Sequence, residues 1–206
     1  MQPSLFADDE LLLNIAGAQL SYRPRFVSDH QRWYEQLVEL ICWQQDRINV
    51  YGKDMPIPRL NAWYGDDGMD YSYSGIQLRA RPWNEPLLAL KRQLESSLNV
   101  TFNSVLANFY RDGNDSVSWH ADDEPELGTQ PLIASLSLGE TRRFSLRHKT
   151  DRSLPVQHID LEGGSLLVMA GETQRYWHHQ LPKTSYSIGG RINLTFRSII
   201  SKPGTP

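Results

Sequence analysis

Eight short runs of apolar or alternating residues occupy the second half of the chain. They cover residues 103–111, 115–120, 131–138, 142–148, 155–161, 164–169, 174–181 and 190–200. Gly, Pro or Asp stands in most of the gaps, and no helical pattern separates the runs. Such closely spaced strands are typical of an antiparallel sandwich or barrel. The sequence therefore predicts a β-rich core over residues 103–200.

Two helices are predicted in the first half of the chain. Apolar residues recur at helical spacing from Trp33 to Ile41, after Ser28 and Gln31, which are spaced as in a capping box, so we expect a helix over 29–44. The second predicted helix covers 84–98, with Asn84 as its cap, Pro86 in its first turn and four leucines on one face. Residues 46–82 are rich in Gly, Asp, Pro and Tyr and are expected to form short strands and turns.

The length and composition suit one soluble domain. A chain of 206 residues with 39% hydrophobic residues can bury its own core, and we expect a single domain, 1–206, with an N-terminal arm over 1–20. No apolar run approaches the ~20 residues of a membrane helix, and the first residues lack the order of a signal peptide. The single cysteine fits a reducing compartment. Because the net charge is -3, nucleic acid would have to bind to a local patch.

Two His-x-Asp triplets, at 120–122 and 158–160, could each offer an imidazole and a carboxylate to one ion. A third ligand could come from His178 or His179, and two imidazoles with one carboxylate suit non-haem Fe(II) oxygen chemistry. The interval from His120 to His179 leaves room for four strands, enough to wrap a double-sheet roll. From His158 there is room only for a hairpin, so we interpret His158 as structural.

The strongest local pattern is the run 191–197. With a period of two, Arg191, Asn193, Thr195 and Arg197 share one face of a strand, and apolar residues share the other. Inward arginines are costly unless an anion is bound, whereas an exposed outer face is the alternative. Arg191 follows His179 by twelve residues, about one turn and a return strand, which places a guanidinium near the metal. Asn108 and Tyr110 form a second such face, able to donate hydrogen bonds to a carboxylate.

Taken together, these residues resemble the AlkB family of Fe(II)/2-oxoglutarate dioxygenases. The main matching segments are 108–113, 120–124, 133–139, 147–149, 179–182 and 191–197. Upstream, Pro58-Arg59, 64–66 and 71–75 resemble the branch of the family that repairs duplex DNA. The resemblance implies an α+β, mainly β fold: a double-stranded β-helix (jelly roll) catalytic core over 103–200. N-terminal helices and nucleotide-recognition ribbons from 21–102 would pack against that core.

The resemblance also assigns roles to the candidate residues. His120, Asp122 and His179 would bind Fe(II), with His179 preferred to His178 because Gln-Leu-Pro follows it in the family's register. Arg191 would pair with the distal carboxylate of 2-oxoglutarate, since guanidinium matches carboxylate in a bidentate way. Arg197 with Asn108 would hold the metal-binding end of 2-oxoglutarate. The whole predicted 2-oxoglutarate set is Asn108, Tyr110, Arg191, Asn193, Thr195 and Arg197.

The implied reaction is oxidative demethylation of N-alkylated bases in DNA, of the 1-methyladenine and 3-methylcytosine type. It consumes O2 and 2-oxoglutarate and releases formaldehyde, succinate and CO2. The base must leave its stack; Tyr73 and Tyr71 are the predicted aromatic contacts, and Asp123 and Glu124 would favour a cationic base. Tyr51 would lie at the tip of a hairpin that fills the vacated space.

Some features leave the substrate open. The loop after His179, residues 183–190, contains one lysine where the duplex-repairing branch has a basic loop, so single-stranded DNA remains an alternative to duplex. RNA, or a non-nucleic-acid substrate such as a protein side chain, is the further alternative for an enzyme of this fold. We expect a monomer with no membrane partner, located in the cytoplasm, or in the nucleus of a eukaryote.

Overall fold

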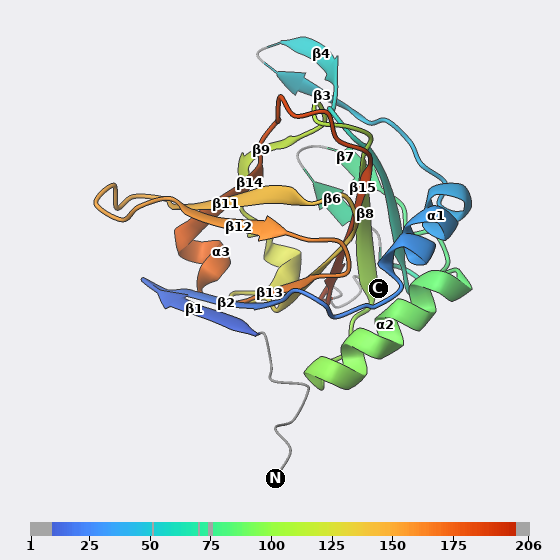
Figure 1. Cartoon of the computed structure of the whole chain (residues 1–206), viewed down its shortest axis with the longest axis horizontal. Helices are drawn as coiled ribbons and strands as arrows, with labels where there is room; N and C mark the ends of the chain where they lie inside the picture. The colour runs from blue at the N-terminus through green and yellow to red at the C-terminus, as the bar shows by residue number, and fades with distance from the viewer. Residues whose placement is uncertain (1–9, 51, 70, 74–75, 201–206) are drawn as a thin grey trace, which may run out of the picture.

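Two antiparallel sheets face each other and form the core of the fold (Figure 1). The computed structural model describes residues 10–50, 52–69, 71–73 and 76–200. The larger sheet contains, in spatial order, β1 (Leu11–Ile15), β2 (Ala18–Arg23), β13 (Leu166–Gly171), β10 (Ile133–Gly139), β15 (Arg191–Arg197), β8 (Ser104–Tyr110) and β5 (Leu60–Gly65). The smaller sheet contains β12 (Gln157–Leu161), β11 (Arg142–His148), β14 (Trp177–Leu181) and β9 (Val117–His120).

The eight strands from β8 to β15 correspond to the eight runs predicted from the sequence. Along the chain they pass from one sheet to the other: β8, β10, β13 and β15 lie in the larger sheet and β9, β11, β12 and β14 in the smaller. Four strands, β10 to β13, separate β9 from β14, as the spacing of His120 and His179 predicts. The mainly β, jelly-roll fold class is confirmed.

The larger sheet has one apolar face and one mixed face. On its outer side, Ile192, Leu194 and Phe196 of β15 are buried together with the apolar faces of two helices, α1 (His30–Leu40) and α2 (Glu85–Leu98). Figure 1 shows both helices on this side, away from the smaller sheet. A second apolar cluster, which includes Phe144 and Trp177, fills part of the space between the two sheets. The rest of that space contains the candidate site, which is lined by both polar and apolar side chains.

The two long helices differ in how well their ends were predicted. Asn84 caps α2 as expected, because its Oδ1 accepts a hydrogen bond from the Leu87 N–H at 3.0 Å. In contrast, α1 is shorter than the predicted 29–44, and the Ser28–Gln31 capping box does not form. The N-cap is Asp29, without a side-chain bond, and Gln31 bonds Glu35 instead. The helix ends because Ile41 takes an extended conformation and is buried in the core.

Residues 10–20 form part of a hairpin, not the predicted arm. Strand β2 pairs with β13 over six residues, from Ala18 opposite Gly171 to Arg23 opposite Leu166. Ala18, Leu20 and Tyr22 alternate along β2 and are buried between the sheets. This period of two is a strand signal. Over residues 10–20 the arm prediction was wrong, because it gave more weight to the acidic start of the chain than to this alternation; residues 1–9 lie outside the described residues.

The predicted strand 174–181 is also only partly correct, because a short helix, α3 (Thr173–Tyr176), precedes β14. A strand would turn Thr173 and Gln174 to opposite faces, whereas the helical turn buries both. Thr173 Oγ1 then accepts from the Gln19 N–H, and Gln174 reaches the candidate site.

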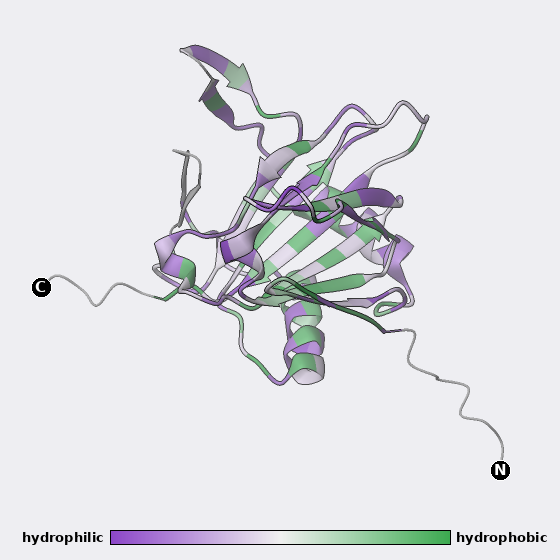
Figure 2. Cartoon of the chain, turned by 90° about the vertical axis from the view of Figure 1, so that its left-hand side faces the viewer, coloured by the Kyte–Doolittle hydropathy of each residue, from purple (hydrophilic) through white to green (hydrophobic). Residues whose placement is uncertain are grey.

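Two small hairpins occupy the region 46–82, as expected. They are β3 (Arg47–Val50) with β4 (Lys53–Pro56), and β6 (Tyr71–Tyr73) with β7 (Ile76–Leu78). The β3–β4 hairpin stands away from both sheets at the top of Figures 1 and 2. Within the described ranges, no helix is long and apolar enough to cross a membrane.

Candidate active site

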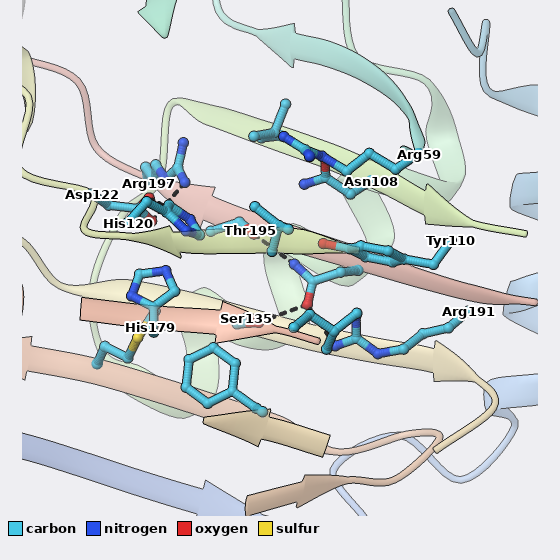
Figure 3. A pocket seen from close by; sticks show the side chains of 16 residues that line it. Arg59, Asn108, Tyr110, His120, Asp122, Ser135, His179, Arg191, Thr195 and Arg197 are labelled. Carbon is cyan, nitrogen blue, oxygen red and sulfur yellow. Dashed lines mark hydrogen bonds and ion pairs between the residues drawn. The ribbon is translucent and has the colours of Figure 1, made fainter. Parts of the chain in front are cut away.

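Two histidines face each other where β9 and β14 pair. His120 ends β9 and lies opposite His179 in the register, and the centroids of the two rings are 4.2 Å apart. Asp122 follows two residues after β9, and its carboxylate joins them at one end of a pocket between the sheets (Figure 3). One ligand atom from each of these three residues lies within 4.8 Å of the other two. The structure therefore brings together the three predicted metal ligands.

Neighbouring groups hold the Asp122 carboxylate and leave one of its oxygens open. Arg197 Nη2 donates to Asp122 Oδ2 at 2.7 Å, and the Asp122 N–H donates to Gln174 Oε1 at 2.9 Å. Asp122 Oδ1 is buried and has no hydrogen-bond partner among the described residues, and it lies 3.8 Å from His120 Nε2. A buried carboxylate oxygen directed at an imidazole nitrogen is the arrangement expected of two ligands of one cation.

The tautomer of His120 also suits a metal. Its Nδ1 lies 2.8 Å from the carbonyl oxygen of Ser118. Because a carbonyl can only accept a hydrogen bond, Nδ1 carries the proton and the Nε2 lone pair is directed toward Asp122. Metal-bound histidines commonly use their second nitrogen in this way.

The protonation states of the cluster match those of metal ligands. Burial, reinforced by the charge of His120, lowers the pKa of His179 to about 3. Burial also lowers the pKa of His120. For Asp122, burial is the largest single influence and opposes ionisation, but the charge and hydrogen bond of Arg197 together with the charges of His179 and His120 outweigh it and lower the pKa to about 2. At neutral pH the cluster has two neutral imidazoles and one carboxylate, the forms that bind a divalent cation.

The inward face of β15 runs from the cluster, where Arg197 lies, to the opposite end of the pocket, where Arg191 lies (Figure 3), and the predicted alternation is confirmed. Arg191, Asn193, Thr195 and Arg197 all line the pocket, and Asn108 and Tyr110 of β8 line it beside them. Arg191 Nη2 donates to Ser137 Oγ at 2.8 Å and to Asn193 Oδ1 at 2.9 Å, and Asn193 Nδ2 donates to Thr195 Oγ1 at 2.6 Å. The alternative of an exposed, solvated strand face is therefore wrong.

Arg191 is a buried cation whose surroundings suit the binding of an anion. It is 1% exposed, and burial lowers the pKa of its guanidinium to about 10. Among the described residues, its Nε has no hydrogen-bond partner and no carboxylate forms an ion pair with its guanidinium. Figure 3 shows Arg191 and Tyr110 at the end of the pocket away from His120 and Asp122. A small molecule with a carboxylate at one end and metal-binding oxygens at the other fits this layout.

Arg197 and Asn108, which were predicted to hold the metal-binding end of 2-oxoglutarate, each have a protein partner. Arg197 donates to Asp122, and Asn108 Oδ1 accepts from Arg59 Nε at 2.9 Å. Both side chains still line the pocket. Their roles toward 2-oxoglutarate stay predictions.

The sequence reasoning missed four residues of the site. Arg59 lines the pocket, and it could have been found because Pro58-Arg59 is one of the segments that carry the family resemblance. Ser135 and Ser137 bond the polar row of β15, and their alternation with apolar residues in β10 was a usable signal. Gln174 had no signal, because the region was predicted to be a strand.

The remaining candidates lie elsewhere or outside the described side chains. Asp123 lies on the surface next to the cluster, where its Oδ2 forms an ion pair with Lys149 Nζ at 2.8 Å. Glu124 follows it and is partly buried. Tyr71 and Tyr73 belong to β6, whose backbone alone is described, and Tyr51 lies outside the described residues.

The two other candidate histidines are not in the pocket. His158 lies on the exposed side of β12, with Nδ1 2.9 Å from Ser145 Oγ. His178 neighbours His179 on β14 and is therefore directed to the opposite face of the sheet. Neither belongs to the group formed by His120, Asp122 and His179, as predicted.

The fold and this site agree with the sequence comparisons. The chain matches the 2OG-Fe(II) oxygenase superfamily over residues 19–197, and it belongs to this family. The Fe(II), 2-oxoglutarate and O2 expected from the sequence are therefore the cofactor and cosubstrates of the family, and the three cluster residues fit the iron.

Relatives within the family narrow the similarity to AlkB-type proteins. The mouse protein "Alpha-ketoglutarate-dependent dioxygenase alkB homolog 3" is 44% identical over 181 residues, which cover 84% of this chain and 63% of the mouse protein. The mouse "DNA oxidative demethylase ALKBH2" is 39% identical over 175 residues, covering 82% of this chain and 73% of the relative. The chain thus matches slightly less than two thirds of the length of the alkB homolog 3 proteins.

A solved structure supports the fold alone. The structure titled "The structure of OsALKBH1" aligns with a TM-score of 0.61 and 16% identity, covering 91% of this chain and 100% of the other.

Proposed function

We propose that this protein is an Fe(II)/2-oxoglutarate-dependent dioxygenase that removes methyl groups from N-alkylated bases in DNA. The observation that carries the proposal is the pocket between the sheets. It has a His-Asp-His cluster at one end and, at the other, a buried arginine with which no carboxylate of the described residues forms an ion pair. A cation and a dicarboxylate bound side by side would neutralise both ends.

In this proposal the protein's own residues bind and orient the reactants. His120, Asp122 and His179 would hold Fe(II), which supplies the oxygen activation. Arg191 would hold the distal carboxylate of 2-oxoglutarate, with Tyr110 beside it and Asn193 and Thr195 completing the polar row. Overall, 2-oxoglutarate and O2 give succinate and CO2, and the methyl group leaves as formaldehyde after hydroxylation.

The substrate assignment draws on the names of the relatives and on charge. A 1-methyladenine or 3-methylcytosine carries a positive charge, and Asp123 and Glu124 follow directly on the ligand Asp122. Aromatic faces also favour such a cation, and Tyr71 and Tyr73 are our candidates for them. A relative with 39% identity is called a DNA oxidative demethylase.

A basic surface next to the cluster supports binding of a phosphate backbone. Arg147 of β11 is paired with His178, and its guanidinium lies 4.3 Å from the centroid of the Trp119 ring. Lys149 follows two residues later. Because Lys149 also forms an ion pair with Asp123, its charge is partly offset, and Arg147 contributes most of the local positive charge on a chain whose net charge is -3. We propose that DNA, single-stranded or duplex, binds here to a monomer in the cytoplasm or nucleus.

The test is mass spectrometry of methylated oligonucleotides after incubation with the protein, Fe(II), 2-oxoglutarate and O2. DNA and RNA, each single-stranded and annealed, are compared, and succinate is measured in parallel. We expect loss of the methyl group and stoichiometric succinate from the wild type and from His158→Ala, and neither product from His179→Ala. If none of the oligonucleotides increased succinate release but a protein substrate did, the chain would belong to a different substrate class.

A further inference from the structure

Arg142 is a buried cation that lies behind the pocket and does not line it. It begins β11, on the same inward face as Phe144, and is 3% exposed. Its guanidinium carbon lies 5.8 Å from the centroid of the Tyr110 ring, and that of Arg191 lies 5.4 Å from the same centroid. Tyr110 therefore contacts one guanidinium from each sheet.

The hydrogen bonds of Arg142 all go to backbone carbonyls. Its Nη1 donates to the Asp112 carbonyl at 3.1 Å, and its Nη2 donates to those of Asp115 at 2.9 Å and Pro182 at 2.7 Å. The Asp115 carboxylate is occupied by Arg111, and no side-chain carboxylate in the described part of the chain forms an ion pair with Arg142. A buried charge without a paired carboxylate is expensive, so local packing alone is a poor reason for an arginine here.

These three carbonyls belong to the two loops that lead to Tyr110 and Arg191. Asp112 and Asp115 lie in the loop that follows Tyr110, and Pro182 begins the loop between β14 and Arg191. The loops also meet at Gly113, whose carbonyl accepts from the Thr184 N–H at 2.9 Å. A Cβ on Gly113 would lie 2.6 Å from the Thr184 carbonyl oxygen, so the approach is close. Arg142 thus ties together both chain segments next to the anion-binding end.

The charge of Arg142 also acts on Arg191. Burial lowers the pKa of Arg191, and the nearby charge of Arg142 acts in the same direction. Two like charges close together in a buried site repel each other, and an anion bound beside Arg191 would relieve that repulsion. Removing Arg142 should therefore weaken the binding of an anion beside Arg191. It would also remove the hydrogen bonds that hold the two loops.

We propose that Arg142 is a positioning residue for the cosubstrate: it holds Tyr110 and the approach to Arg191 from behind and adds a second positive charge near the distal carboxylate. The inference rests on the proposed function, in which Arg191 binds that carboxylate. Because Arg142 does not line the pocket, it acts through its neighbours and not by contact.

The experiment is calorimetric titration of 2-oxoglutarate into protein loaded with Mn(II), a stand-in for Fe(II) that avoids turnover. Arg142→Met removes the charge and the hydrogen bonds. Arg142→Lys keeps the charge but loses the planar guanidinium, whose two terminal nitrogens donate to the three carbonyls. Arg143→Met is the matched control, because Arg143 is the next residue of β11, is exposed and pairs with Asp160. Titration of Mn(II) into each metal-free variant measures the metal affinity of the His-Asp-His cluster separately.

We expect Arg142→Met to raise the Kd for 2-oxoglutarate by about tenfold, within the range of couplings seen between members of one network. Arg142→Lys should fall between that variant and the wild type, and should carry the test if Arg142→Met does not fold. Arg143→Met and every Mn(II) affinity should be unchanged. Wild-type affinity in both Arg142 variants, or an equal loss of Mn(II) and 2-oxoglutarate binding, would overturn the inference. A wild type that binds Mn(II) but no 2-oxoglutarate would instead overturn the proposed function.

Discussion

Asp122 is held by two neighbours through different atoms, and the less obvious of them is Gln174. Arg197 bonds the carboxylate, whereas Gln174 bonds the backbone N–H and is itself 2% exposed. Gln174→Leu leaves that N–H buried without a partner, which costs about 1–3 kcal/mol. We expect Mn(II) to bind about ten- to a hundredfold more weakly, by analogy with residues that orient metal ligands. Titration of the metal measures this, and Gln180→Leu on the neighbouring strand is the control.

Arg191 permits a prediction that separates the two ends of the pocket. In Arg191→Ala the distal carboxylate loses its partner, and breaking a buried pair of this kind costs about 3–5 kcal/mol, or more than a hundredfold in affinity. The metal end should be unaffected, since Arg191 contacts Ser137 and Asn193 and not the cluster. Calorimetry with 2-oxoglutarate and with Mn(II) tests both statements. An unchanged affinity for 2-oxoglutarate would exclude Arg191 as its anchor.

Among the elements, the strands of the core were predictable because they alternate. In β15 the polar and apolar residues separate without exception, so the sequence alone indicates which side chains enter the pocket. Helix ends and single turns were not predictable. The end of α1 depends on burial of Ile41, and α3 depends on contacts with Gln19 and Asp122, which lie far away in the sequence. Tertiary contacts of this kind leave no local pattern.

The loop after β8 should make stability sensitive to acid. The Asp115 carboxylate is buried, which opposes its ionisation, but the hydrogen bonds from Arg111 together with the charges of Arg111 and Arg142 outweigh burial and lower the pKa. Its stabilising contribution is complete above the unfolded-state pKa of about 3.9 and is lost as the pH falls through the lower folded pKa. Asp115→Asn should lower the free energy of unfolding by about 1–3 kcal/mol at pH 7. Below pH 4 the stability of this variant should depend less on pH than that of the wild type. Urea unfolding at a series of pH values measures this, and Asp160→Asn, which breaks an exposed ion pair, is the control that should destabilise the fold less.

The β3–β4 hairpin carries the prediction about duplex DNA. All of β4 is exposed, and β3 and β4 end on either side of Tyr51, which the sequence places at the tip. If this ring fills the gap left by an extruded base, Tyr51→Ala should reduce kcat/KM on duplex substrate by roughly five- to 150-fold, the value of one stack. Single strands have no gap to fill and should be repaired almost as before. Equal losses on both would show that Tyr51 is a general contact.

At the scale of the whole molecule, the site joins the two sheets. The metal cluster comes from the smaller sheet and the loop after β9, whereas Arg191 belongs to the larger sheet, so a bound metal with 2-oxoglutarate would connect both. The halves of the roll meet here through polar groups, unlike the apolar contacts that pack the helices on the outer face. Ligands that occupy this space should therefore stabilise the fold as well as permit the chemistry.

The size of that stabilisation follows from mass action. Mn(II) at about 100 times its Kd should add about 2.7 kcal/mol to the free energy of unfolding, which for a domain of this size raises the Tm by roughly 5–11 °C. Saturating 2-oxoglutarate should raise the Tm further, but only once the metal is present. Thermal unfolding with each ligand alone and with both measures this. Arg191→Ala should keep the shift due to Mn(II) and lose the one due to 2-oxoglutarate. If 2-oxoglutarate stabilised Arg191→Ala as much as the wild type, the cosubstrate would not connect the metal cluster to β15.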